Sequence, residues 1–223
     1  MVTLPPLILV GASGHAHAVL AVLQRLAAYR VIGLIDSFLP QGSHCHGYPI
    51  LGGVDDLSEL CERHGVSQVL VAIGDNYQRD VMMAKVSQAC PGVDFPVLID
   101  PSAVIAHGVS IGAGSIMMPL AHVGPGSMIG MGCLLNTRSS LDHDGRMGAF
   151  ASLAPGTTTG GNVSIGARSA IGLGSAIRHR VSIGSDTVIG MGSLVISDWP
   201  DGVVVYGAPA CLIRTRLVDE PYL

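Results

Sequence analysis

One histidine in the sequence lies between two carboxylates, in the run Asp142-His143-Asp144. A carboxylate that binds one ring nitrogen of a histidine favours the imidazolium form and leaves the other nitrogen to act as a base. A histidine alone is more often an ordinary surface residue, but two neighbouring acids favour a catalytic role. The run therefore predicts a general base at His143, with either Asp142 or Asp144 as the acid that orients it.

The stretch around this histidine repeats every six residues from Ile105 to Val195. An aliphatic side chain, here termed an anchor, recurs at each sixth position, and Thr159 alone departs from that type. A period of six fits neither an α-helix nor a single strand and indicates a repeat array. It predicts a three-sided left-handed parallel β-helix, in which each hexapeptide forms one side and stacked turns bury a continuous core.

This coil predicts a place for every residue of the hexapeptide. Anchors point inward and stack on the anchors of the next turn, as Ile111 on Ile129 and Ile129 on Met147. Small residues two positions before the anchors fit the crowded interior, and glycine after the anchor lets the backbone bend where a Cβ would obstruct it. The residue two positions after an anchor points outward near a corner, which is where His143 lies.

Two further histidines, His107 and His179, occupy the same outward position as His143. Outward histidines on such coils can bind zinc between subunits. The residues one turn from His143 are not histidines, however, and we expect no metal. A zinc-dependent or purely structural hexapeptide protein remains an alternative.

The first part of the chain has the pattern of a parallel α/β domain. A strand at Leu7–Val10 runs into the turn Gly11–His15 and a helix, which is where such folds bind phosphate, although the third glycine of the dinucleotide motif is missing. Asp36 closes a second strand at Val31–Ile35, and Gly74 follows a third at Val69–Ile73. The carboxyl ends of these strands should lie along one edge, which favours nucleotide binding.

The rest of this part completes a small Rossmann-like sheet. The elements expected are helices at Leu57–Arg63 and Gln78–Ala89, a fourth and last strand at Val97–Ile99, and an exposed loop at Gln41–Gly53 that contains His44-Cys45-His46. The sequence thus predicts a Rossmann-like domain over residues 1–100 and a β-helix over residues 101–223 that ends in a C-terminal cap or a polar tail.

Composition narrows the function classes. With a net charge of −4 and one lysine, the chain is a poor partner for nucleic acid. No apolar run approaches the ~18 residues that span a bilayer, and no signal peptide is recognisable at the start. Five cysteines without paired spacing argue against a disulfide framework. A cytoplasmic protein with no membrane partner is expected.

Several motifs together resemble a bacterial family of sugar O- and N-acetyltransferases. The family includes sialic acid O-acetyltransferase and the N-acetyltransferases of nucleotide-linked 4-amino-4-deoxy sugars in the bacillosamine and perosamine pathways. The motifs are Gly11–His15, Ile73-Gly74-Asp75-Asn76, Asn136-Thr137, Asp142-His143-Asp144, Ala154-Pro155-Gly156, Gly161-Asn162-Val163 and Gly207-Ala208-Pro209-Ala210.

The resemblance implies roles for individual residues. The nucleotide of the sugar would be bound by Ser13, Gly14 and His15, with Asp36 and Ser37 towards the base and Gly74 nearby. His143 would be the general base and Asp144 the acid that raises its basicity. Acetyl-CoA would lie between the subunits of a homotrimer, at positions that match Ser152, Leu173 and Met191.

The function expected is acetyl transfer from acetyl-CoA to the 4-amino group of a 4-amino-4,6-dideoxy sugar linked to UDP, GDP or dTDP. No cysteine is placed to form an acyl-enzyme, so transfer should be direct, within a ternary complex. O-acetylation of a sugar such as sialic acid is the alternative that uses the same base.

Overall fold

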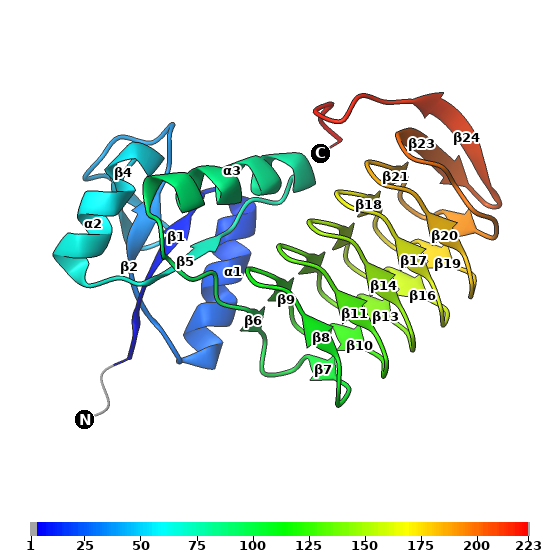
Figure 1. Ribbon diagram of the computed structural model, residues 1–223, viewed down its shortest axis with the longest axis horizontal. Helices are drawn as coiled ribbons and strands as arrows, with labels where there is room; N and C mark the ends of the chain where they lie inside the picture. Colours follow the sequence, from blue (N-terminus) through cyan, green and yellow to red (C-terminus); the bar gives the residue numbers. More distant parts are fainter. Residues whose placement is uncertain (1–3, 223) are drawn as a thin grey trace. The chain divides into compact units, whose positions relative to one another are not determined.

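The computed structural model describes residues 4–222, and the chain divides into two compact units. The first comprises the residues up to Gly74 together with Gln78–Pro96, and the second comprises Asp75–Tyr77 together with the residues from Val97 onwards. The first unit therefore ends before the boundary expected at residue 100. Figure 1 follows the chain through both.

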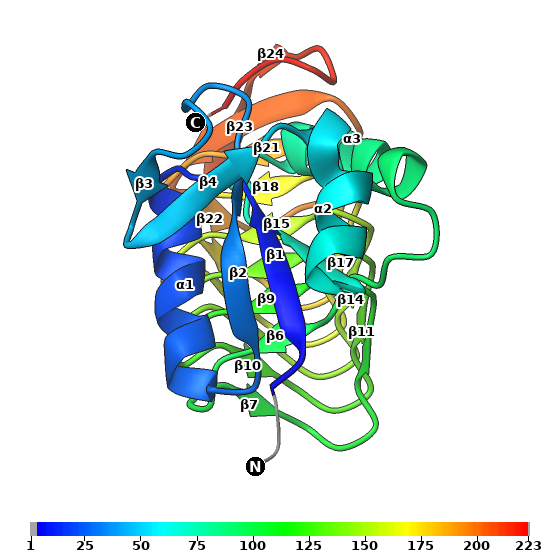
Figure 2. The ribbon, with the colours of Figure 1, turned by 90° about the vertical axis from the view of Figure 1, so that its left-hand side faces the viewer.

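The first unit is a parallel sheet with helices on both faces. Its elements are β1 (Pro6–Val10), α1 (Gly14–Leu26), β2 (Arg30–Ile35), β3 (His44–Cys45), β4 (Tyr48–Gly52), the 3₁₀ turn η1 (Val54–Asp56), α2 (Leu57–His64), β5 (Gln68–Val71) and α3 (Asn76–Ala89), apart from the first two residues of α3, which belong to the second unit. The strand order is β3-β4-β2-β1-β5, and all neighbours are parallel except β3 and β4. Figure 2 shows α1 on one face of the sheet and α2 on the other.

The prediction of an exposed loop at residues 41–53 is wrong, because this segment forms a hairpin. Its turn is His46-Gly47, and both residues have positive φ, 51° and 83°. Two such residues make the type I′ turn that matches the twist of paired strands. Ile50 is buried within β4, which joins β2 as the fourth parallel strand.

The strand expected at Val97–Ile99 exists, but its assignment to the parallel sheet is wrong. β6 (Leu98–Ile99) pairs with β9 of the coil, Leu98 beside Ile116 and Ile99 beside Met117. Ile99 stands six residues before Ile105, so the repeat begins one hexapeptide earlier than the sequence pattern suggested.

The second unit is the predicted three-sided coil of hexapeptides. One side consists of β7 (Val104–Ile105), β10 (His122–Val123), β13 (Ser140–Leu141), β16 (Thr158–Thr159), β19 (Ala176–Ile177) and β22 (Leu194–Val195). The next consists of β8 (Ser110–Ile111), β11 (Met128–Ile129), β14 (Arg146–Met147), β17 (Ser164–Ile165) and β20 (Ser182–Ile183). The third consists of β6, β9 (Ile116–Met117), β12 (Leu134–Leu135), β15 (Ser152–Leu153), β18 (Ala170–Ile171), β21 (Val188–Ile189), β23 (Val203–Gly207) and β24 (Ala210–Thr215).

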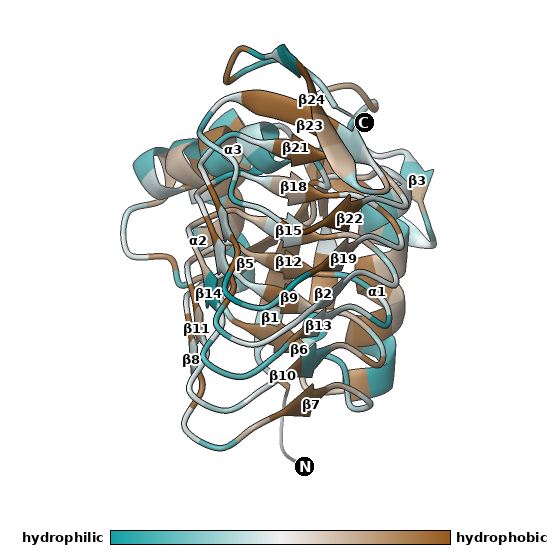
Figure 3. Cartoon of the chain, turned by 90° about the vertical axis from the view of Figure 1, so that its right-hand side faces the viewer, coloured by the Kyte–Doolittle hydropathy of each residue, from teal (hydrophilic) through white to brown (hydrophobic). Residues whose placement is uncertain are grey.

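The anchors fill the coil as predicted. Ile129 pairs with Ile111 on one side and Met147 on the other, and the hydrophobic anchors from Met117 to Val195 form one buried cluster. Figure 3 shows hydrophobic residues recurring along the stacked strands.

The small residues before the anchors do more than fit the interior. Ser115 donates its Oγ hydrogen to the carbonyl of Gly130 (2.9 Å) and accepts from the amide of Cys133 (3.0 Å). Ser169 and Ser175 make the same kind of bond to later glycine carbonyls. Each hydroxyl therefore ties its own turn to the next one.

The glycines after the anchors have a different reason from the one expected. A Cβ at Gly130 would lie 2.7 Å from the amide nitrogen of Ala149 in the next turn, which leaves no room for a side chain. The bends lie elsewhere, three residues after each anchor from Ile105 to Ile189, where φ is positive even at Asp144 (57°) and Asn162 (59°). The close approach of neighbouring turns, rather than backbone bending, requires these glycines.

The C-terminal segment, where a short cap or a polar tail was expected, forms a hairpin at the end of the coil. β23 extends the third side beside β21, and β24 pairs with it in an antiparallel hairpin that includes Arg214 and Thr215. Beyond it, Arg214 forms an ion pair with Glu220 (2.6 Å). Among the described residues, no helix combines the length and apolar character needed to cross a membrane.

Candidate active site

His143 lies in the turn that follows β13, and the structure distinguishes its two acidic neighbours. Nδ1 of His143 lies 2.8 Å from Oδ2 of Asp144. Oδ1 of Asp142 instead accepts a hydrogen bond from the backbone amide of His143 (2.7 Å). Asp144 therefore orients the ring, and Asp142 holds the backbone beneath it. Asp144 stands at a left-handed corner, which aspartate tolerates better than most residues.

This arrangement makes the imidazole more basic. The hydrogen bond that Nδ1 donates to Asp144 raises the pKa of His143 above its usual value, the charges of Asp142 and Asp144 add to that rise, and partial desolvation opposes it. The side chain of His143 is 52% exposed, so a substrate can reach the ring. With Nδ1 occupied, Nε2 is the nitrogen available to take a proton.

The ring lies directly against a glycine in the next turn. A Cβ at Gly161 would overlap Nε2 and Cε1 of His143. A cavity of about 320 Å³ opens here, lined by His143, Gly161, Asn162, His179 and Arg180. The coil thus provides a basic nitrogen beside an open, partly cationic hollow.

The turn that carries His143 is held from the turn before it. Ser127 donates its Oγ hydrogen to the carbonyl of Asp142 (2.9 Å) and accepts from the amide of Gly145 (3.0 Å). Neither Ser127 nor Arg180 was expected at this site. Their positions in the repeat are visible in the sequence, but the pattern alone does not indicate which serine or arginine lies beside the histidine.

The turn after β1 places Ser13, Gly14 and His15 at the start of α1. Gly11 is the residue this turn requires, because its φ is +108° and a Cβ would lie 2.9 Å from the carbonyl oxygen of Ala72. Gly14 has open space around it, and Ser13 makes no side-chain capping bond. The hydroxyl of Ser13 therefore remains available at the helix N-terminus, where anions bind favourably.

His15 is electrically neutral under ordinary conditions. Burial, together with the charge of Arg79, lowers the pKa of His15 to about 4. Its Nε2 is buried without a hydrogen-bond partner. An uncharged imidazole with one unused nitrogen suits hydrogen bonding to a ligand better than charge pairing.

Asp36 and Ser37 line a second hollow of the first unit, of about 340 Å³, together with Gln41, Asp55 and Asp56. Oδ1 of Asp36 accepts hydrogen bonds from the amides of Phe38 (2.8 Å) and Leu39 (3.1 Å), so this carboxylate also shapes its own turn. The ends of β2 and β4 lie side by side at this hollow, because the amide of Asp36 donates a hydrogen bond to the carbonyl of Gly52 (3.1 Å).

Gly74 lies beyond the end of β5, and its carbonyl accepts a hydrogen bond from Nη1 of Arg79 (2.9 Å). The same nitrogen binds the carbonyl of Ile73 (2.9 Å). Arg79 is only 1% exposed, so it fixes this turn from within the unit.

The His44-Cys45-His46 segment supports the glycine turn from the side. Sγ of Cys45 lies 3.4 Å and Nε2 of His46 3.2 Å from the carbonyl oxygen of Ala12. The ring of His46 stacks on that of His17, with 4.2 Å between centroids. Among the described residues, no group of three or more His, Cys, Asp or Glu side chains is arranged to hold a metal ion.

The three residues expected to contact acetyl-CoA lie on the coil in different surroundings. Ser152 is 8% exposed, and its Oγ accepts a hydrogen bond from Nδ2 of Asn76 (3.0 Å). Leu173 and Met191 are 51% and 75% exposed. They occupy the same corner of neighbouring turns, where the amide of Gly192 bonds to the carbonyl of Leu173 (2.8 Å). The structure does not bring Ser152 to that corner.

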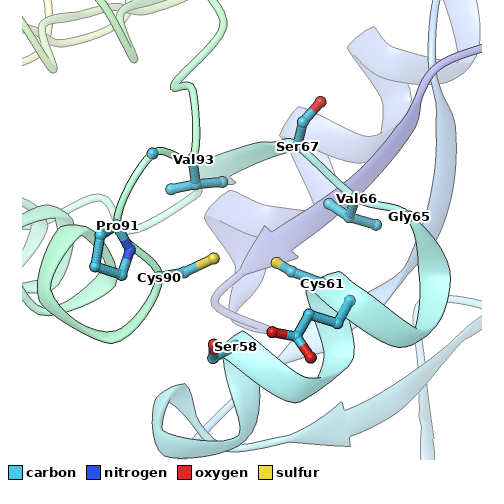
Figure 4. Close-up of a pocket in the computed structure, with 10 residues that line it drawn as sticks. Ser58, Cys61, Gly65, Val66, Ser67, Cys90, Pro91 and Val93 are labelled. Carbon is cyan, nitrogen blue, oxygen red and sulfur yellow. The ribbon is translucent and has the colours of Figure 1, made fainter.

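A separate cavity of the first unit, of about 390 Å³, contains two thiols. Cys61 on α2 and Cys90 after α3 point towards each other in Figure 4. All five cysteines are free. Burial and the hydrogen bond with Cys90 raise the pKa of Cys61 to about 12, so this thiol stays protonated and is a poor nucleophile.

Comparison with known proteins shows which families and structures this chain resembles. The sequence profile of the PglD N-terminal domain matches residues 6–86. PerB from Caulobacter crescentus, solved in complex with CoA and GDP-perosamine, is 32% identical over 95% of this chain and 99% of its own, with a TM-score of 0.88. The acetyltransferase domain of PglB from Neisseria gonorrhoeae, in complex with acetyl coenzyme A, is 32% identical over 95% and 100%, with a TM-score of 0.85. WeeI from Acinetobacter baumannii is 27% identical over 95% and 100%, with a TM-score of 0.83. The comparison with curated protein sequences finds no match.

A left-handed parallel β-helix of hexapeptides with an acid-flanked histidine on its surface, preceded by a Rossmann-like unit, defines an acyltransferase. The chain belongs to the bacterial family of sugar acetyltransferases.

Proposed function

We propose that the protein transfers the acetyl group of acetyl-CoA to the 4-amino group of a nucleotide-linked 4-amino-4,6-dideoxy sugar, with His143 as the general base. The observation that carries this proposal is the geometry of one side chain. Asp144 occupies Nδ1 of His143, and the rest of the ring borders an open cavity at Gly161. Similarity to an enzyme solved with GDP-perosamine and CoA supports the choice of substrates.

The proposed mechanism is direct transfer within a ternary complex. The amine nitrogen attacks the thioester carbonyl carbon, and Nε2 of His143 takes the proton that the nitrogen loses. The C–S bond of the tetrahedral intermediate then breaks, and the proton on His143 neutralises the departing thiolate of CoA. General-base help of this kind contributes about 10²–10⁴-fold. Holding both substrates in line provides much of the remainder.

The first unit supplies the groups for the nucleotide. Ser13, Gly14 and the neutral His15 offer hydrogen bonds to the phosphates and sugar at the start of α1, with Gly74 nearby. The hollow lined by Asp36 and Ser37 is the position for the base.

The coil supplies the surface for acetyl-CoA and, we infer, for two further copies of the chain. Leu173 and Met191 present exposed apolar side chains at one corner, suited to the apolar part of the cofactor. Other exposed apolar residues of the coil include Val104, Leu120, Met128, Met131, Leu194 and Ile196. A homotrimer would cover part of this surface and complete each acetyl-CoA site with a neighbouring coil.

The direct test is acetyl-CoA consumption by the purified protein against GDP-, UDP- and dTDP-linked 4-amino sugars. The matched control is the same nucleotide sugar with a 4-hydroxyl group, and free sialic acid serves as the acceptor for the alternative. We expect turnover only with an amine acceptor. Turnover of sialic acid and none of the amines would replace the proposal with O-acetylation.

The pH dependence of kcat/KM tests the role of Asp144. A general base must be neutral, so activity falls as the pH drops through the raised pKa of His143. Asp144→Asn keeps a residue that tolerates the left-handed corner but removes the charge. We expect the acid limb to move to lower pH, and the plateau to fall by about 10- to 100-fold because a weaker base remains. Asp142→Asn, which spares the bond to Nδ1, should move the limb less. If the acid limb of the profile does not move in Asp144→Asn, the limb does not report the titration of His143.

A further inference from the structure

One rung of the coil is irregular, and it immediately precedes His143. After each anchor from Ile99 to Ile177, the backbone amide donates to the carbonyl of the anchor one turn later; Gly124 to Leu141 and Gly160 to Ile177, both at 2.8 Å, are the flanking examples. The amide of Asp142 departs from this rule. It donates to the side-chain oxygen of Thr159, at 3.1 Å.

The strand pairing carries the same irregularity. β13 and β16 pair through Ser140 and Thr158 alone, whereas β10 with β13 and β16 with β19, on either side, pair through both residues. The regular ladder resumes directly afterwards, since the amide of Asn162 bonds to the carbonyl of His143 (2.9 Å). The departure is thus confined to the end of β13.

Thr159 is also the one anchor of the coil that is not hydrophobic, and it is only 8% exposed. A hydroxyl in an aliphatic core is unfavourable unless it forms a hydrogen bond. Here its oxygen accepts the amide of Asp142 in place of a backbone carbonyl. The break in the sequence pattern and the break in the ladder therefore have one cause.

We propose that Thr159 is a positioning residue for His143: its hydroxyl holds the end of β13 in a non-ladder position and so sets the place of the imidazole over Gly161. This inference rests on the proposed role of His143. Ser127 holds the same turn from the other side, through Asp142 and Gly145. Without the hydroxyl, the amide of Asp142 must lose its partner or shift to the carbonyl of residue 159. Either change moves the backbone that carries the ring.

The test compares two substitutions at one site. Thr159→Val keeps the shape but removes the acceptor, and we expect kcat to fall by about 10- to 100-fold, as displaced catalytic groups do, with KM for both substrates within about twofold. Thr159→Ser keeps the acceptor and should retain kcat within about threefold. Thr157→Val is the matched control, because it removes a buried hydroxyl of the same turn that bonds instead to the carbonyl of Gly172 (3.0 Å). It should leave kcat near the wild-type value.

Wild-type kcat in Thr159→Val, or equal losses in the valine and serine variants, would overturn the inference. His143→Ala, assayed alongside, distinguishes a failure of this inference from a failure of the proposed function. An active His143→Ala variant would show that His143 is not the base. An inactive His143→Ala variant together with a fully active Thr159→Val variant would refute only the role of Thr159. A crystal structure of Thr159→Val gives a result without any assay. We expect the ring of His143 displaced from Gly161, and an unmoved ring would refute the proposal.

Discussion

Replacing His143 with alanine is expected to lower kcat by at least ~100-fold and to leave the KM values for acetyl-CoA and the sugar nearly unchanged. In the proposed mechanism the imidazole takes a proton as the amine attacks, so its loss should raise the barrier of that step. The same proposal assigns ground-state binding to other groups, in the first unit and along the coil. Steady-state kinetics with each substrate varied in turn will measure both effects.

His107→Ala is the matched control. His107 occupies the same position of its hexapeptide as His143 and is exposed, but it lies two turns away and outside the cavity. We expect near-normal kinetics from it. Added imidazole should restore part of the activity of His143→Ala by replacing the missing base in the open cavity. A His143→Ala enzyme with near-normal kcat would remove His143 from the mechanism.

Gly161→Ala is expected to be nearly as damaging, although it adds a single methyl group. That methyl would occupy the space of Nε2 and Cε1 of His143, so the ring must leave the position in which Asp144 binds it. A displacement of about 1 Å in a catalytic group can cost ~100-fold in rate. The backbone itself tolerates a side chain here, since Ala149 and Ala167 occupy the same position of other hexapeptides.

A double-mutant cycle shows whether the methyl group acts through the histidine. Adding Gly161→Ala to His143→Ala should cause little further loss, because the ring that the methyl displaces is already absent. The melting temperature of Gly161→Ala should match or exceed that of the wild type, since alanine has less conformational freedom than glycine when unfolded. Additive losses in the double variant, or a large fall in melting temperature, would contradict this explanation.

The repeat made the coil predictable, because one period determines which side chains face inward at every turn. Anchor stacking, the outward position of His143 and the parallel pairing all followed from spacing alone. Two elements were not predicted correctly, each for a local reason. β4 depends on a His46-Gly47 turn that lacks the usual Asn-Gly pattern, and β6 is too short to reveal from its own residues which sheet it joins.

A contact between His143 and a neighbouring acid was predictable from the sequence, but which of the two acids binds the ring was not. Both Asp142 and Asp144 neighbour His143 in the sequence, and only the corner geometry turns Asp144 towards Nδ1 and Asp142 towards the backbone. Ser127 and Thr159 could not be assigned from the pattern, because their roles depend on bonds between turns. Thr159 did interrupt the aliphatic series, and that exception was the visible sign of its different bonding.

The fixed six-residue phase limits how a chain of this kind can change length. Removing one residue from a corner would turn every later anchor to the solvent and bring the outward residues into the core. Insertions and deletions are tolerable only as whole turns of the β-helix, or as loops that leave and rejoin the coil at one corner. Comparisons among distant homologues should therefore show gaps in steps of complete turns. The histidine should keep the same position relative to the turn that supports it.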